Sequence, residues 1–181
     1  MSGDVGEGFR PPVPADSASE WRTPQVLPQR KPNRLSSAVY RGGGAFFLTV
    51  CVSGTRRPFS SGRIVGSALE ALKKAADQFG IEAIEYCFMP DHLHLLVVAP
   101  QKVDIMTFME RFKQMSGFAC NRLLRSAGRF WQRSYYDHVL RRSEDIEAVT
   151  EYIRGNPLRA GLVKDAQDYP FSGSLLERRE V

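Results

Sequence analysis

The stretch IEAIEYCFMPDHLHLLVVA, residues 81–99, decides the fold. Its first part, residues 81–89, alternates in polarity, which is typical of a strand with one buried face. Pro90 and Asp91 form a turn signal, and the apolar run 92–99 follows at once. The stretch therefore predicts a β-hairpin with two antiparallel strands.

Other strands and helices are predicted before the hairpin. The run AFFLTVCV, residues 45–52, is rich in aromatic and β-branched side chains and predicts a buried strand. Apolar residues then recur every three or four positions over 64–79, which predicts an amphipathic helix. Gly80 is placed to end that helix.

Two further helices and a strand are predicted after the hairpin. Asp104 can cap a helix that carries apolar residues on one face up to Leu123. The aromatic segment 130–140 predicts a strand. Ser143 is then expected to cap a third helix, which Pro157 should stop because proline disfavours helical geometry in the residue before it.

This order of elements indicates an α+β fold, ferredoxin-like in outline. We expect a mainly antiparallel sheet of four to five strands with helices packed on one face. The length fits one domain, assigned to residues 37–176. Residues 1–36 are rich in Pro, Gly, Ser and charge, which predicts a flexible basic tail, and residues 177–181 are a short C-terminal tail.

The charge of the chain favours a polyanionic partner. Its formal net charge is +5, and residues 107–142 carry eight basic side chains against two acidic ones. The alternative is that these arginines only solvate helix faces. Three isolated cysteines and the lack of a long apolar run predict a reduced, cytoplasmic protein without membrane association.

The histidines His92 and His94 stand one residue apart in the second hairpin strand. Residues i and i+2 of a strand point to the same face, so the two imidazoles should lie side by side. Such a pair can hold a divalent metal and leaves coordination positions open for a further ligand or for substrate oxygens. The alternative is that both are hydrogen-bonded residues of a half-exposed strand.

Tyr152 and Asn156 lie four residues apart in the third predicted helix and therefore on one side of it. The phenol is a potential nucleophile and the amide oxygen a potential metal ligand. The structural alternative is a tyrosine packed at the edge of the core and an asparagine that ends a helix.

Five segments together resemble the single-tyrosine HUH transposases, and more closely their REP-associated branch. They are YRGGGAFFLTV (40–50), MPDHLHLLV (89–97), FWQRSYYDHVLR (130–141), YIRGNPLRAGLV (152–163) and YPFSG (169–173). The resemblance implies a ferredoxin-like sheet that carries the two histidines, with a catalytic tyrosine on a helix nearby.

By position, the resemblance implies that His92, His94 and Asn156 bind Mg²⁺ or Mn²⁺ and that Tyr152 is the nucleophile. The implied reaction cleaves and rejoins single-stranded DNA through a 5′-phosphotyrosine, next to a DNA hairpin of REP type. The resemblance also implies that the protein is a monomer and not a dimer whose subunits exchange their tyrosine helices. His138 is an alternative third ligand, and a non-catalytic DNA-binding protein is the alternative function.

Several basic and aromatic residues are candidate DNA contacts, because phosphate contacts and base stacking dominate such interfaces. They are Arg129, Arg133, Arg141, Arg142, Arg41 and Tyr136, with Arg30, Lys31 and Arg34 in the basic tail.

Overall fold

The structure, a computed structural model, describes residues 43–140 and 143–176. The predicted α+β class is confirmed: one five-stranded sheet has the order β4-β1-β3-β2-β5, and every neighbouring pair is antiparallel. The strands are β1 (Gly44–Cys51), β2 (Glu82–Met89), β3 (His92–Ala99), β4 (Tyr136–Leu140) and β5 (Ser172–Gly173). The proposed tails at 1–36 and 177–181 lie outside the described residues.

The predicted hairpin forms the centre of the sheet. Met89 pairs with His92 across the Pro90–Asp91 turn, and β3 is bordered by β2 on one side and by β1 on the other. Because β3 is the middle strand, its side chains lie away from the sheet edges. The histidines therefore stand on the central strand of the sheet.

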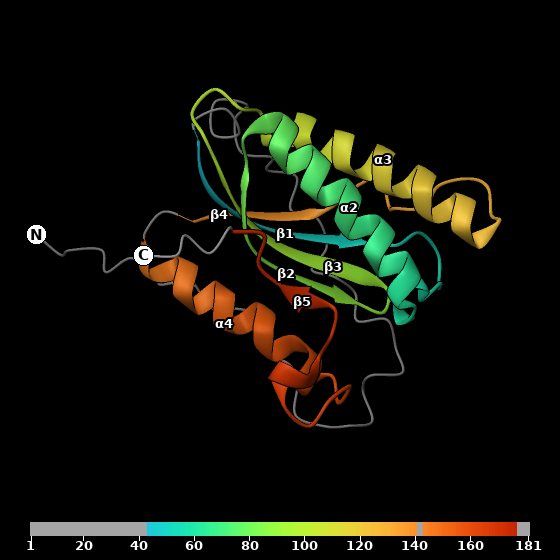
Figure 1. Cartoon of the computed structure of the whole chain (residues 1–181). Helices are drawn as coiled ribbons and strands as arrows, with labels where there is room; N and C mark the ends of the chain where they lie inside the picture. Colours follow the sequence, from blue (N-terminus) through green and yellow to red (C-terminus); the bar gives the residue numbers. More distant parts are fainter. Residues whose placement is uncertain (1–42, 141–142, 177–181) are drawn as a thin grey trace, which may run out of the picture.

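The three helices occupy both faces of the sheet, so the expectation that they share one face is wrong for one of them. Helices α2 (Gly62–Phe79) and α3 (Ile105–Leu124) cover one face, and α4 (Ser143–Arg159) lies on the other (Figure 1). The physical reason is that β1 and β3 are apolar on both faces. Leu93 and Leu95 pack with α2 and α3, whereas Leu96 packs with Val149 and Ile153 of α4.

The ends of α2 and α3 follow the expected capping chemistry. Gly80 adopts a left-handed conformation with φ 62° after α2, and the Asp104 side chain accepts a hydrogen bond from Met106 N at 2.9 Å. Short 3₁₀ turns, η2 (Pro58–Ser60) and η3 (Ala166–Asp168), complete the described elements. No helix in the described part of the chain is long and apolar enough to cross a membrane.

Helix α4 departs from expectation at both ends. It begins at Ser143 itself, and Pro157 lies inside it, because the helix continues to Arg159. The bias of a residue before proline against helical geometry is overcome by side-chain bonding: Asn156 Nδ2 donates to the Tyr152 carbonyl at 2.9 Å. Burial of Pro157 and Ile153 holds this part of the helix against the sheet.

Candidate active site

The two histidines converge on a single point. His92 and His94 lie on the face of β3 that α4 covers, and their Nε2 atoms are 3.1 Å apart. His94 is buried, with 6% of its surface exposed, whereas the His92 side chain retains 26%. Two nitrogens that each lie about 2.1 Å from one ion, at right angles, would be separated by about 3 Å. The spacing therefore suits a pair of metal ligands.

Each imidazole also has a hydrogen-bond partner at its Nδ1 atom. Asp91 Oδ1 lies 2.7 Å from His92 Nδ1, and Thr49 Oγ1 lies 2.9 Å from His94 Nδ1. A hydrogen bond at Nδ1 fixes the ring orientation and, when Nδ1–H donates it, leaves the lone pair on Nε2. The Asp91 carboxylate is thus more than a turn residue. The hydrogen bond with His92 lowers the pKa of Asp91, which keeps the carboxylate ionised.

The environment of His94 keeps its imidazole neutral. Burial lowers the pKa of His94 well below its usual value, and the charges of His92 and Arg159 act in the same direction. A neutral imidazole has a lone pair to give to a metal. Within the described residues, no group of three or more His, Cys, Asp and Glu side chains is arranged to hold an ion. A metal at this pair would therefore need an amide or substrate oxygen.

Helix α4 brings Tyr152 to the histidines, although the two motifs are far apart in the sequence. The Tyr152 ring lies edge-on to His94, with ring centroids 5.9 Å apart, and edge-on to Phe47 at 5.8 Å. The ring is half-buried. The predicted tyrosine helix and histidine strand therefore share one site.

The phenol of Tyr152 is not ionised in its resting state. Burial raises the pKa of Tyr152 above its usual value of 10.0, while the charge of Arg159 and a hydrogen bond with the Asn156 side chain lower it. The charge of Tyr136 adds a further small increase in this pKa. Attack by the phenol oxygen therefore requires removal of its proton as the reaction proceeds.

Of the two candidates for the third ligand, Asn156 lies nearer to the tyrosine. Its side chain bonds to the Tyr152 carbonyl and also interacts with the phenol. His138 belongs to β4 and pairs with Phe47 of β1, whose ring stacks on His94 at 5.7 Å. Strand β1 thus separates His138 from the histidine pair by two strand spacings, about 10 Å.

The structure adds two residues that were not predicted from the sequence, one beside Tyr152 and one beside His94. The Arg159 guanidinium lies 4.7 Å from the centre of the Tyr152 ring, and it donates a hydrogen bond to the Tyr152 carbonyl. Thr49 is the second, and it holds His94. A spacing of seven residues on one helix was the available signal for Arg159. Thr49 is the strand partner of His94, and only the register of β1 against β3 identifies it.

An ion pair joins α4 to the sheet near the site. The Arg154 guanidinium donates from Nε and from one terminal nitrogen to Glu85 Oε2, at 3.0 and 2.8 Å. Glu85 is 2% exposed, whereas Arg154 lies at the surface. Burial raises the pKa of Glu85, and Arg154 partly offsets this. The pair fixes the helix that carries Tyr152.

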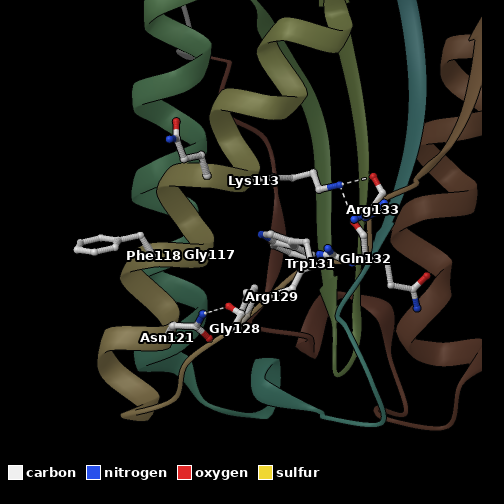
Figure 2. A pocket seen from close by; sticks show the side chains of 11 residues that line it. Lys113, Gly117, Phe118, Asn121, Gly128, Arg129, Trp131, Gln132 and Arg133 are labelled. Carbon is white, nitrogen blue, oxygen red and sulfur yellow. Dashed lines mark hydrogen bonds between the residues drawn. The ribbon is translucent and has the colours of Figure 1, made fainter.

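The candidate DNA contacts divide between the two faces of the sheet. Tyr136 lies on the same face of the sheet as the two histidines, with its ring 6.3 Å from that of Phe47. Arg129 and Arg133 are exposed and line a groove of about 410 Å³ along α3, on the opposite face (Figure 2). The remaining candidates, Arg30, Lys31, Arg34, Arg41, Arg141 and Arg142, lie outside the described residues.

Lys113 also lines this groove. Its ammonium donates to the carbonyls of Gln132 and Arg133, at 2.6 and 2.9 Å, and these bonds are drawn in Figure 2. The segment that carries both arginines is therefore tied to α3. Phe118 points away from the other labelled side chains of the groove and is 72% exposed.

Comparison with known proteins finds related sequences. The sequence model described as "Transposase IS200 like" matches residues 47–156. A REP-associated tyrosine transposase of Escherichia coli is 27% identical over 135 residues, which cover 74% of this chain and 78% of that protein. A Haemophilus influenzae protein of the same name is 27% identical over 140 residues, covering 72% and 79%.

A solved structure gives the same result. The structure of a REP-associated tyrosine transposase bound to a REP hairpin has 25% sequence identity and a TM-score of 0.66, and the match covers 77% of this chain and 79% of the other. The family model spans more than half of the sequence, and it includes both histidines, Tyr152 and Asn156. The chain therefore belongs to the IS200-like transposase family.

Proposed function

We propose that this protein cleaves and rejoins single-stranded DNA, with Tyr152 as the nucleophile. The observation that carries the proposal is the contact of the Tyr152 ring with His94, whose Nε2 faces that of His92. A nucleophile beside two metal-binding nitrogens is the arrangement that transfer of a phosphoryl group requires. A purely structural tyrosine would not need this neighbour.

The reaction is a transesterification. The Tyr152 oxygen attacks phosphorus and loses its proton, so that a tyrosine–phosphate bond forms at the 5′ end. The bond to the 3′ oxygen breaks, and that oxygen takes up a proton. The number of phosphodiester linkages is unchanged, so the reverse attack by a 3′-hydroxyl rejoins strands without an external energy source.

Members of the family generally use a divalent metal. We assign Mg²⁺ or Mn²⁺ to His92 and His94, with Asn156 as the third protein ligand. The fit is supported by the converging Nε2 atoms and by the neutral state of His94. When bound, such an ion polarises the scissile phosphate. Burial of His94 and its bond to Thr49 keep the donor atoms in place.

The DNA is proposed to contain a hairpin next to a single-stranded cleavage site. A relative was solved with a REP hairpin. Arg129 and Arg133 provide exposed positive charge on the α3 groove, and Tyr136 can stack on an unpaired base near Tyr152. We further propose that the protein works as a monomer on DNA in the cytoplasm.

A covalent-adduct assay tests the proposal. The protein is incubated with Mn²⁺ and a labelled pool of hairpin oligonucleotides that carry randomised single-stranded flanks, and products are resolved on a denaturing gel. We expect a protein–DNA adduct that Tyr152→Phe abolishes and that chelation of the metal prevents. Tyr136→Phe is the matched control because its hydroxyl lies on the same face, and it should retain the adduct.

The alternative function makes the opposite prediction. A DNA-binding protein without catalysis would bind the same pool tightly and form no adduct with any member. Adduct formation that survives in Tyr152→Phe would instead assign the nucleophile to another residue. Either result would contradict the proposed function.

A further inference from the structure

Arg159 is fixed on Tyr152 by two contacts. Its guanidinium covers the ring at 4.7 Å from the centroid, and it donates to the Tyr152 carbonyl. An exposed arginine in the last turn of a helix commonly interacts with the terminal carbonyls of that helix. Contact with one particular aromatic ring is more specific than that, and it restricts where the phenol can lie.

Gly155 makes this placement of Arg159 possible. A Cβ atom at position 155 would lie 2.5 Å from Arg159 Nη1 and 3.4 Å from its Cζ. The guanidinium therefore crosses the helix surface at the one position in that turn that lacks a side chain. Any larger residue at position 155 would displace the guanidinium, although the helix itself could accept it.

The helix next to Tyr152 also loses one backbone hydrogen bond at Pro157. Proline has no N–H, so the carbonyl of Ile153, four residues earlier, lacks its regular helical partner. The adjacent Tyr152 carbonyl accepts hydrogen bonds from two side chains, those of Asn156 and Arg159. The backbone and the ring of Tyr152 are thus both held by side chains from the following two turns.

We propose that Arg159 is a positioning residue, which Gly155 admits, and that it holds the Tyr152 ring in its attacking position beside His94. The inference rests on the proposed function, since it concerns how the same tyrosine is oriented. Misplacement of a nucleophile by about 1 Å can reduce a rate by about a hundredfold, so the orientation of this ring matters for the chemical step.

Paired variants test the inference. Arg159→Gln removes the guanidinium, and Gly155→Ala displaces it while leaving Arg159 in the sequence. Gly66→Ala is the matched control, because Gly66 is an exposed helical glycine in α2 whose added Cβ would meet nothing within 4 Å. Adduct formation is measured in a single turnover with Mn²⁺ and saturating hairpin DNA, together with DNA affinity and the melting temperature.

We expect Arg159→Gln and Gly155→Ala each to slow adduct formation by about tenfold to a hundredfold. Their melting temperatures and DNA affinities should stay close to those of the unmodified protein. The double variant should be no slower than Arg159→Gln alone, because both changes remove the same contact. A further variant, Arg159→Ala, removes the whole side chain, and added guanidinium ion should partly restore its rate. Gly66→Ala should react at the unmodified rate.

Three results would overturn the inference: unchanged adduct formation in Gly155→Ala, multiplicative losses in the double variant, or a loss explained wholly by weaker DNA binding. These results are distinct from failure of the proposed function. In that case the unmodified protein would itself form no adduct.

Discussion

At the scale of single residues, the proposed metal site depends on the hydrogen-bond partners of the two imidazoles. Thr49 and Asp91 each engage one Nδ1 atom, so that both Nε2 atoms face the same point. Without these bonds the imidazoles could rotate away from each other or adopt the other tautomer. Partners of this kind typically affect metal affinity by about tenfold to a hundredfold.

Replacement of Thr49 tests this supporting role. Thr49→Val keeps the shape of the side chain but removes the hydroxyl that bonds His94. We expect Mn²⁺ affinity, measured by isothermal titration calorimetry, to fall by about tenfold to a hundredfold. Asp91→Asn should have an effect of similar size through His92.

Thr150→Val is the matched control for this measurement. The Thr150 hydroxyl bonds the Ile146 carbonyl on α4, so this variant loses a threonine hydroxyl away from the imidazoles. It should bind Mn²⁺ as the unmodified protein does. Equal affinities for Thr49→Val and Thr150→Val would show that the Thr49 bond has no role in metal binding.

At the scale of elements, the position of α4 determines whether Tyr152 meets the histidines. Val149 and Ile153 are fully buried against the sheet, and the Glu85–Arg154 pair attaches the helix to β2. Because Glu85 is almost completely buried, removal of Arg154 leaves a carboxylate with little access to water. Such an unpaired group is costly.

We therefore expect Arg154→Ala to lower the free energy of unfolding by about 1–3 kcal/mol, as judged by urea denaturation. The exposure of Arg154 places the effect toward the lower end of this range. Glu85→Gln combined with Arg154→Ala should recover part of the loss, because no charge then remains buried. A double variant that is less stable than Arg154→Ala would contradict this explanation.

The loss of folding stability in Arg154→Ala should also depend on pH. Burial raises the pKa of Glu85 and Arg154 counteracts it, so the pKa rises further when Arg154 is removed. A carboxyl whose pKa is higher in the folded than in the unfolded protein destabilises the fold above that pKa, and protonation relieves the cost. The difference in stability between Arg154→Ala and the unmodified protein should therefore be largest at neutral pH and smaller near about pH 5.

At the scale of the whole molecule, the tyrosine and the histidines come from one chain. Tyr152 contacts His94 without a helix from a second copy. One chain therefore carries all the protein residues of the proposed site. In a dimer that exchanges tyrosine helices, a chain without the tyrosine and a chain without a histidine would together rebuild one active site.

Mixing two inactive variants distinguishes these arrangements. We expect a mixture of His94→Ala and Tyr152→Phe to form no adduct, because neither chain holds a complete site. Each variant should also elute as a monomer in size-exclusion chromatography. Adduct on the His94→Ala chain in the mixture would establish helix exchange and contradict the monomer proposal.

The groove along α3 provides a second test at this scale. Arg129→Ala and Arg133→Ala should each weaken DNA binding. Each should also make the slope of log affinity against log salt concentration shallower by about 0.7 to 0.9, because each lost phosphate contact releases one counterion fewer on binding. Lys164→Ala is the charge-matched control, since Lys164 is exposed and does not line the groove. An equal change in slope for Lys164→Ala would remove the groove from the DNA interface.

The sequence alone predicts the elements and the chemical groups of the site. Turn chemistry at Pro90 and Asp91, strand periodicity and the i, i+2 spacing of His92 and His94 are local properties, so they can be read without knowing the fold. The spacing of four between Tyr152 and Asn156 is local in the same sense.

Only the tertiary structure decided which face of the sheet carries α4 and which residues surround the site. Thr49 meets His94 through the register of β1 on β3. Pro157 continues the helix that its local preference would end. These outcomes depend on burial of both sheet faces and on contacts between distant segments, and such long-range terms outweigh the local preferences of single residues.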